Sequence, residues 1–393
     1  MNKVKIFVAM FSVVLLSQIF LVSAAIGRGD SWAVKASMPT GRFNCQSVVA
    51  TNSMIYVMGG TGVSDIPTKS PFVPPGSIAY PNIIVSVNEM YNPDTDTWAT
   101  KKSMPTPREN FGLTTSQNKI YAIGGTVDNK KSTTGANEVY DIETDAWETK
   151  ASLPSAMACL DANAVGEKIY VIGGRQPTLS GGDSYLNDNW VYDIETDVWS
   201  TKTPSPIKIK DYASAAIDNK IYILTYEGAL YESGNSLLIY DTDTDKWSQG
   251  TSMSASVHSA VMGATTDKTA PKRLYVISMD LDVVQIYDPV TNKWSTGTQM
   301  PTERLGFSIA VLNDNLYVIG GTGVEGLSVN EMYTPVTEHK TANSQININS
   351  ANSQININSA NSQININILV AVVAIITISG IGIIRLKIKK RKT

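Results

Sequence analysis

The sequence predicts an all-β fold in which short strands form a closed ring of six repeats. Five segments contain a Tyr followed seven residues later by a Trp, at Tyr91/Trp98, Tyr140/Trp147, Tyr192/Trp199, Tyr240/Trp247 and Tyr287/Trp294. A sixth Tyr, Tyr333, lacks this Trp, whereas Trp32 near the N-terminus lacks the Tyr. The sixth repeat is therefore expected to be split between the two ends of the chain. Pairing those ends closes the ring and removes its last open edge.

Residues 1–25 are expected to be a secretory signal peptide. They combine Lys3 and Lys5 with a long apolar run and small residues that end at Ala25. These three parts, in this order, are typical of a secretory signal. An uncleaved anchor or a buried first helix is the alternative.

Each repeat is expected to form four short strands, and the second repeat shows them most clearly. Residues 110–115 are apolar and small, residues 119–125 read KIYAIGG, and residues 137–140 precede an acidic turn and Trp147. Short β-rich runs bounded by turn residues are typical of an all-β fold. In the sixth repeat, residues 304–312, 316–321 and 328–333 supply three strands, and residues 32–38 are expected to supply the fourth.

A Gly pair closes the second strand in four repeats. The pairs are Gly59-Gly60, Gly124-Gly125, Gly173-Gly174 and Gly320-Gly321; Leu224-Thr225 and Ser278-Met279 replace them in the other two repeats. A Gly pair followed by Tyr and then Trp, at a period of about 50 residues, resembles the kelch family. The resemblance covers residues 31–340 and implies a six-bladed β-propeller.

Charged residues recur at two positions in three of the repeats. The first strand begins with Arg42, Arg108 or Arg304, and the residue two before the Tyr is Glu89, Glu138 or Glu331. The other repeats have Trp190, Leu238 and Gln285 in place of the Glu and lack the Arg. This joint occurrence predicts a structural ion pair within each blade, because losing one partner would strand the other. The alternatives are a cationic trough for a carboxylate or phosphate, or paired arginines that also contact ligand.

The longest insertion follows the first Gly pair and spans residues 61–85. It contains five prolines together with Phe72 and Tyr80. Loops of this kind often carry binding residues, and the kelch resemblance implies that loops after the Gly pairs lie on the face that binds partners. It therefore implies a ligand face made of Phe72, Tyr80, Arg175, Tyr185 and Tyr226. The alternative is a loop that only packs on the rim.

No cofactor, metal or catalytic site is predicted. Acidic turns such as residues 141–145 lack the Gly and Glu that complete a calcium loop. The two histidines, His258 and His339, cannot build the copper site of the galactose-oxidase relatives of this fold. The two cysteines, Cys45 and Cys159, are expected to be buried thiols rather than a disulfide.

The C-terminal part predicts a membrane anchor. Residues 341–367 repeat NSQININSA without charge, Pro or Gly, which predicts a disordered stalk or, alternatively, a self-pairing segment. Residues 368–384 are 17 uncharged and mostly apolar residues, close to the shortest span of a bilayer. Residues 385–393 are basic and belong on the cytoplasmic side. The expected arrangement is a single-pass type I protein of the plasma membrane with the propeller outside.

The charge distribution narrows the function. The chain has 32 Lys+Arg and 35 Asp+Glu, but eight of the cations lie in its two end segments, so the middle carries about 11 net negative charges. An acidic body argues against nucleic-acid binding. The sequence therefore predicts a non-catalytic cell-surface module for binding or adhesion to a surface protein or polysaccharide. The alternative is an exported carbohydrate mutarotase or epimerase of kelch type.

Overall fold

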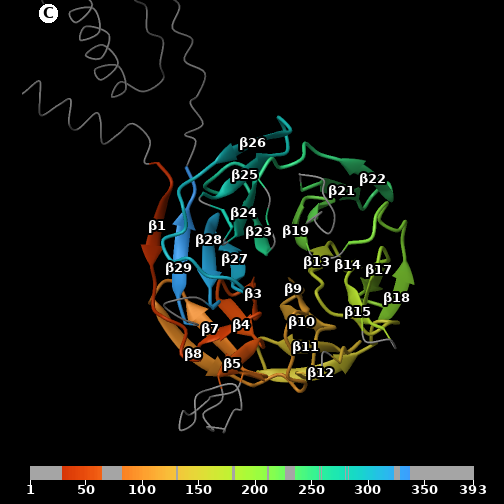
Figure 1. The fold of residues 1–393 in the computed structure, drawn as a ribbon. Coiled ribbons are helices and arrows are strands. Elements are labelled where there is room, and N and C mark those ends of the chain that lie inside the picture. The colour runs from red at the N-terminus through yellow and green to blue at the C-terminus, as the bar shows by residue number, and fades with distance from the viewer. Residues whose placement is uncertain are drawn as a thin grey trace, which may run out of the picture. The chain divides into compact units, whose positions relative to one another are not determined.

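The structure is a computed structural model. It describes residues 29–63, 82–129, 132–178, 182–209, 212–225, 235–255, 257, 259–278, 280–281, 283–322 and 328–336. Every helix or strand in these ranges is a β-strand, which confirms the predicted all-β class (Figure 1). The predicted signal peptide, stalk, transmembrane helix and basic tail lie outside the described residues. Within the described ranges no helix is long and apolar enough to cross a membrane.

The described strands form six four-stranded antiparallel sheets and two smaller ones. The first three sheets are β3 (Gln46–Val49), β4 (Ile55–Met58), β7 (Asn88–Asn92) and β8 (Thr97–Lys101); β9 (Gly112–Ser116), β10 (Lys119–Ile123), β11 (Asn137–Asp141) and β12 (Ala146–Lys150); and β13 (Ala162–Val165), β14 (Lys168–Ile172), β17 (Asn189–Asp193) and β18 (Val198–Thr201). The next three are β19 (Tyr212–Ile217), β20 (Lys220–Thr225), β21 (Leu237–Asp241) and β22 (Lys246–Gln249); β23 (Ala260–Ala264), β24 (Leu274–Ser278), β25 (Gln285–Asp288) and β26 (Lys293–Thr296); and β27 (Ser308–Leu312), β28 (Asn315–Ile319), β29 (Asn330–Thr334) and β1 (Ser31–Val34). The smaller sheets are β2 (Arg42–Phe43), β5 (Thr61–Val63) and β6 (Asn82–Ile84), and the hairpin β15 (Arg175–Pro177) with β16 (Asp183–Tyr185).

The four-stranded sheets stand around a common centre with their first strands innermost (Figure 1). Contacts between first strands run from β3 to β9, β13, β19, β23 and β27 and back to β3, so the circle has no gap. Six apolar clusters fill the spaces between neighbouring sheets. In one of them, Ile55 and Val57 of the first sheet pack with Tyr317 and Ile319 of the sixth. Sheets packed radially in this way form a β-propeller.

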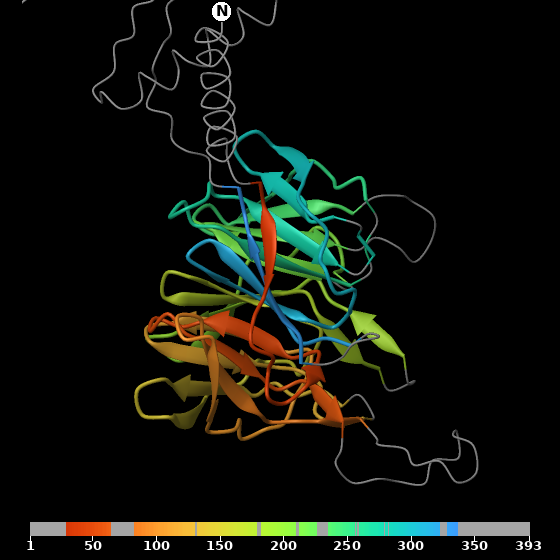
Figure 2. The same ribbon diagram turned by 90° about the vertical axis from the view of Figure 1, so that its left-hand side faces the viewer.

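The sixth sheet is assembled from both ends of the repeat region. β1 pairs antiparallel with β29, and Trp32 lies opposite Tyr333 (Figure 2). The strand is shorter than the predicted residues 32–38, although the backbone N–H of Met38 still donates to Ser328. Trp32 and Tyr333, each without its partner in the sequence, therefore form the Tyr–Trp pair of the sixth sheet.

A Tyr, an Asp or Asn and a Trp join each sheet to the sheet before it in the ring. The Tyr hydroxyl donates to a carboxylate or amide oxygen at 2.5 to 2.7 Å; the acceptor lies five residues later in five sheets and comes from the N-terminal segment in the split sheet. The same oxygen accepts a backbone N–H from the neighbouring sheet, at 2.6 to 2.9 Å. The Trp indole N–H donates to a carbonyl nearby in that sheet. These acceptors, here named the latch residues, are Asp96, Asp145, Asp197, Asp245, Asn292 and, for the split sheet, Asp30.

Substitution at Asp197 tests the latch. The Tyr192 hydroxyl and the Ala151 N–H hold the pKa of Asp197 below its usual range against the opposing effect of burial. Its φ of 56° suits Gly or Asn, so Asp197→Gly removes the side chain without backbone strain. We expect Asp197→Gly to lower the free energy of unfolding by about 1–2 kcal/mol. Asp197→Asn should stay within about 0.5 kcal/mol, because Asn292 already serves in the fifth sheet. Equal losses in denaturant titrations of the two variants would contradict the latch.

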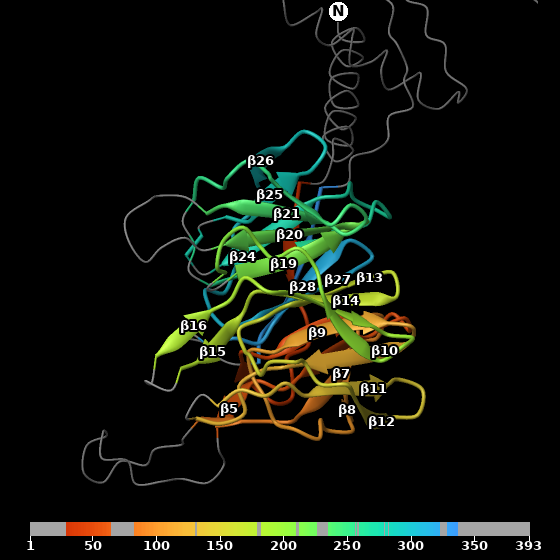
Figure 3. The ribbon, with the colours of Figure 1, turned by 90° about the vertical axis from the view of Figure 1, so that its right-hand side faces the viewer.

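The two faces of the ring differ in which connections they carry. Isolated bridges join the loops after the second strands to the segments entering the first strands, as between Glu109 and Thr126 or Ala158 and Arg175. We name this side the mouth face. β5 and the β15–β16 hairpin project on this same side (Figure 3). The turns from first to second and from third to fourth strands lie on the opposite side, named the turn face.

Candidate binding site at the mouth of the central channel

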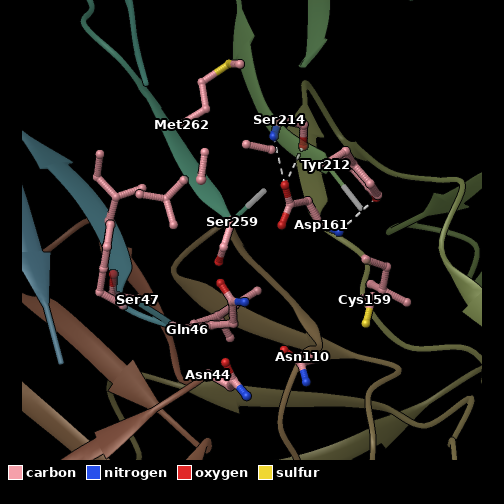
Figure 4. Close-up of a pocket in the computed structure, with 18 of the residues that line it drawn as sticks. Asn44, Gln46, Ser47, Asn110, Cys159, Asp161, Tyr212, Ser214, Ser259 and Met262 are labelled. Carbon is pink, nitrogen blue, oxygen red and sulfur yellow. Dashed lines mark hydrogen bonds between the residues drawn. The ribbon is translucent and has the colours of Figure 1, made fainter. Parts of the chain in front are cut away.

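A cavity of about 290 Å³ opens at the centre of the mouth face. Segments at or before the start of the first strand in all six sheets line it (Figure 4). Its polar lining residues are Asn44, Gln46, Ser47, Asn110, Asp161, Tyr212, Ser214 and Ser259. Ser47, Met262 and Ile309 also line a second cavity of about 270 Å³, whose other walls are apolar or small. The cavity on the mouth face is therefore the more polar of the two cavities.

Backbone hydrogen bonds between sheets fix part of the cavity rim. The N–H of Asn44 donates to Gly306, that of Asn110 to Asn44, and that of Cys159 to Asn110. All four residues have positive φ, between 52° and 68°. Asn and Gly adopt this conformation readily, whereas Cys rarely does. The rim is thus a head-to-tail chain of backbone bonds across four sheets, which holds the side chains around it in place.

Asp161 carries a carboxylate into the cavity beside two hydroxyl groups. Its Oδ2 accepts from the backbone N–H of Ser214 at 2.8 Å and from the Ser214 hydroxyl at 3.0 Å (Figure 4). Asn163 donates to the same hydroxyl at 2.8 Å. The backbone N–H of Asp161 donates to the Tyr212 hydroxyl at 2.9 Å. This network joins the third and fourth sheets and fixes the orientation of the carboxylate.

Burial changes the acidity of both groups. It raises the pKa of Asp161 to about 6, although the bonds from Ser214 oppose the shift. Burial and the nearby Asp161 charge also raise the pKa of Tyr212 well above its usual range. Asp161 is therefore a carboxyl group that the fold destabilises in its ionised form.

Asp161→Asn should make the protein more stable at neutral pH. Because the folded pKa of Asp161 lies above the unfolded value, its stabilising contribution is complete at low pH and is lost as pH rises through about 6. We expect the variant to gain on the order of 2 kcal/mol at pH 7.5 and nothing at about pH 4. Asp193→Asn is the matched control, since bonds from Thr196 lower the pKa of that exposed carboxyl. Urea titrations at both pH values measure the difference, and a loss of stability at pH 7.5 in Asp161→Asn would contradict the assignment.

A family model agrees with the fold. The KLHDC2/KLHL20/DRC7 Kelch-repeats domain matches residues 75–277, which is more than half of the chain. The chain belongs to the kelch-repeat family. Kelch repeats typically mediate protein binding.

Individual kelch proteins match over shorter stretches. Kelch-like protein 7 of Rattus norvegicus and that of Mus musculus are each 32% identical over 164 residues, which cover 42% of this chain and 19% of theirs. Beta-scruin of Limulus polyphemus is 30% identical over 100 residues, which cover 25% of this chain and 9% of its own. The matched stretches thus span a fifth or less of the length of these relatives.

The predicted ligand-face residues are only partly described. Phe72, Tyr80 and Tyr226 lie outside the described residues. Arg175 and Tyr185 face one another in the β15–β16 hairpin, next to the rim of the cavity on the mouth face. Arg175 is buried and pairs with Asp183 at 2.9 Å, and its guanidinium also interacts with the Cys159 thiol. Neither Arg175 nor Tyr185 lines the cavity.

The three arginines lie four residues before the first strands β3, β9 and β27 and not at their starts, where the sequence predicted them, because Arg42 belongs to β2 and the other two to the connecting segments. Each binds a glutamate of the third strand of the sheet that it precedes. The distances are 2.5 Å for Arg42–Glu89, 2.5 Å for Arg108–Glu138 and 2.6 Å for Arg304–Glu331. Each arginine is at most 1% exposed. Arg42 and Arg304 also donate to backbone carbonyls of their second strands, Val57 and Val318. None of the three lines the cavity, so the described contacts are those of a structural pair.

Neither cysteine forms a disulfide, and both line the cavity. Cys45 is buried as predicted, its thiol lies 3.9 Å from the Ser308 hydroxyl, and burial raises its pKa. Cys159 is only half-buried, so the expectation of a buried thiol was wrong for this residue. It lies on the rim with positive φ and is one of the lining residues.

Asp161, Tyr212, Ser214 and Ser47 were not singled out from the sequence. The segment that leads into the first strand of the third sheet reads LDANAV, and a carboxylate among small and apolar residues just before an innermost strand was the available signal. The other residues of the cavity could not be grouped with it, because they come from different sheets.

Proposed function

We propose that the protein is a non-catalytic binding protein that holds a protein partner on the mouth face of a six-bladed propeller. The observation that carries the proposal is the cavity, where side chains from all six sheets converge at the centre of one face. A concave site with a few converging polar groups is the usual form of a binding site. The kelch membership supports a protein as the ligand.

Apolar side chains on the rim support a protein partner further. Val63 of β5 and Ile83 of β6 are exposed on neighbouring strands of the small β2–β5–β6 sheet. Leu305, also exposed, bridges to Thr322 on the mouth face. Apolar groups around a polar centre supply the contact area that protein partners bury.

The strand directions leave the mouth face free of both ends of the described ring. β1 is a fourth strand and starts on the turn face, and β29 is a third strand and ends there. Ser31 lies opposite Thr334 at that edge. Both ends of the described ring therefore lie on the side away from the cavity.

For the ends of the chain we propose cell-surface display, on the support of sequence alone. Residues 1–25 would direct export, residues 341–367 would form a stalk, residues 368–384 would cross the plasma membrane, and residues 385–393 would stay in the cytoplasm. The propeller, residues 31–340, would then face the outside and meet a surface protein. A surface polysaccharide is the alternative ligand.

Photo-crosslinking from the two faces tests the proposed binding surface. A photo-crosslinking amino acid would replace Val63, 45% exposed on the mouth face, or Val290, 90% exposed in a turn on the turn face. We expect the full chain, expressed in its own cells, to capture a discrete protein from position 63 and not from the more exposed position 290. Capture of the same protein from position 290 alone would contradict the proposed face, and capture of glycan alone would favour the polysaccharide.

Sugar mutarotation is the second candidate, and Asp161 is the observation that favours it. A carboxyl group with a pKa of about 6 beside a Tyr hydroxyl in a polar cavity has the acidity that general acid–base catalysis needs. If the protein is a mutarotase, it should speed anomer exchange of free sialic acid, followed by proton NMR, and Asp161→Asn should abolish the effect. An exchange rate equal to that of buffer would exclude this candidate.

A further inference from the structure

The mouth cavity has the chemistry of a receptor for one positively charged side chain. We propose that it binds a single Arg or Lys side chain of the protein partner, with the Asp161 carboxylate as its counter-charge. This inference rests on the proposed function and specifies what the partner must present.

The charge of the cavity is negative and comes from one residue. Among the described residues that line it, Asp161 is the single acidic one, and none is Lys, Arg or His. Three buried arginines lie nearby in the fold, but each is already bound to a glutamate. Arg175 is likewise paired with Asp183. None of the described residues around the cavity therefore supplies a positive charge to neutralise the Asp161 carboxylate.

The hydrogen bonds of Asp161 leave one oxygen for a ligand. Ser214 donates twice to Oδ2, whereas no residue that the structure describes donates to Oδ1. A carboxylate taken out of water is costly unless a cation or several donors compensate it. A guanidinium or ammonium group at Oδ1 would supply both the charge and the donors.

A second polar group in the cavity also lacks a partner. The Ser47 hydroxyl is in a residue only 9% exposed, and it has no hydrogen-bond partner among the described residues. It lines the cavity from the first sheet, while Asp161 lines it from the third (Figure 4). An unsatisfied buried hydroxyl costs free energy until a ligand pairs with it. The cavity thus offers a charged acceptor and a neutral acceptor on different walls, as the several N–H groups of one basic side chain require.

The size of the cavity favours a side chain over a whole small molecule. Its volume of about 290 Å³ lies at the lower limit of pockets that enclose drug-sized ligands, which measure about 300–1,000 Å³. The exposed Val63, Ile83 and Leu305 lie outside it on the mouth face, where the rest of a partner would rest. The net negative charge of the chain between its ends also attracts a basic partner.

Blocked tripeptides with a matched neutral control test this inference. The probes are acetyl-Gly-Arg-Gly-amide, acetyl-Gly-Lys-Gly-amide and acetyl-Gly-citrulline-Gly-amide, where citrulline has the shape of arginine without its charge. Ligand-observed NMR on the full chain at pH 7.5 would measure binding at millimolar concentrations. We expect the Arg or the Lys peptide to bind at least about tenfold more tightly than the citrulline peptide.

Variants then assign the preference to the cavity. Asp161→Asn should remove the preference for charge, and Ser47→Ala should weaken binding of the charged peptide a few-fold. Asp193→Asn removes an exposed carboxylate at the end of β17 and should change neither value. Equal binding of the Arg and citrulline peptides, no binding of any peptide, or an unchanged preference in Asp161→Asn would each overturn the inference.

The outcomes separate this inference from the proposed function. If a protein is captured from position 63 but charged and neutral peptides bind equally, the cavity is not a receptor for a basic side chain, whereas the mouth face remains the binding surface. If no protein is captured but peptide binding depends on charge, the cavity remains a site for a basic side chain, whereas the proposed protein partner is refuted.

Discussion

A protein lacking residues 29–38 should lose on the order of 5 kcal/mol of stability, and its melting temperature should fall by roughly 10 °C or more. This deletion removes β1, so β29 becomes an open edge and the sixth sheet keeps three strands. It also removes two partners of the buried Tyr333. The hydroxyl of Tyr333 donates to Asp30 at 2.5 Å, and its ring lies 5.1 Å from that of Trp32.

Adding the missing strand back in trans makes this prediction specific. A synthetic peptide of residues 29–38 should raise the melting temperature of the deleted protein in a concentration-dependent way. Tyr333→Phe in the intact chain is the mild comparison, because it removes only one hydrogen bond and should cost about 1 kcal/mol. A deleted protein that melts like the intact one, measured by circular dichroism, would show that the ends do not close the ring.

Glu138→Ala should cost about 3–5 kcal/mol, because it leaves the Arg108 guanidinium buried without its counter-charge. Arg108 is fully buried, and burial lowers its pKa while Glu138 opposes that shift. Glu138 also accepts from the Thr106 hydroxyl. The variant therefore leaves the Arg108 guanidinium without its counter-charge and the Thr106 hydroxyl without its acceptor.

The double variant Arg108→Met/Glu138→Leu should recover most of that loss. The third sheet has Met157 and Trp190 at the corresponding positions and folds without a pair. Apolar residues of similar volume often replace a buried ion pair at little cost. Urea titrations measure the stability of both variants. If the double variant is as unstable as Glu138→Ala, mutual neutralisation of Arg108 and Glu138 does not account for the pair, and its assignment as a purely structural ion pair is wrong.

Features repeated along the chain could be predicted from the sequence. The Tyr–Trp spacing locates the third and fourth strands of each repeat, because Tyr91 and Trp98 lie opposite one another across a tight turn. The orphan Trp32 and Tyr333 predict the split sheet. The joint occurrence of Arg and Glu predicts which residues meet, since each pair lies within one repeat.

Contacts between different repeats could not be predicted from these periodic features. Asp141 accepts hydrogen bonds from the backbone N–H groups of Glu143 and Thr144 within its own turn. Asp145, four residues later, instead joins its sheet to Lys102 of the neighbouring repeat. No period in the sequence distinguishes the two roles.

The cavity shows the same limit. Asp161 and Ser214 are 53 residues apart and meet because the third and fourth sheets stand side by side. Ser47 approaches them from the first sheet. Every repeat contributes residues to the lining, so the site appears only after the ring is closed.

The most direct test of the account is the affinity of the protein captured from position 63 for the full chain and for two variants. We predict that this protein binds the wild type and Asp193→Asn equally and binds Asp161→Asn at least about tenfold more weakly, although Asp161→Asn is the more stable fold at pH 7.5. Equal affinity for all three proteins would contradict the claim that the mouth cavity recognises the partner.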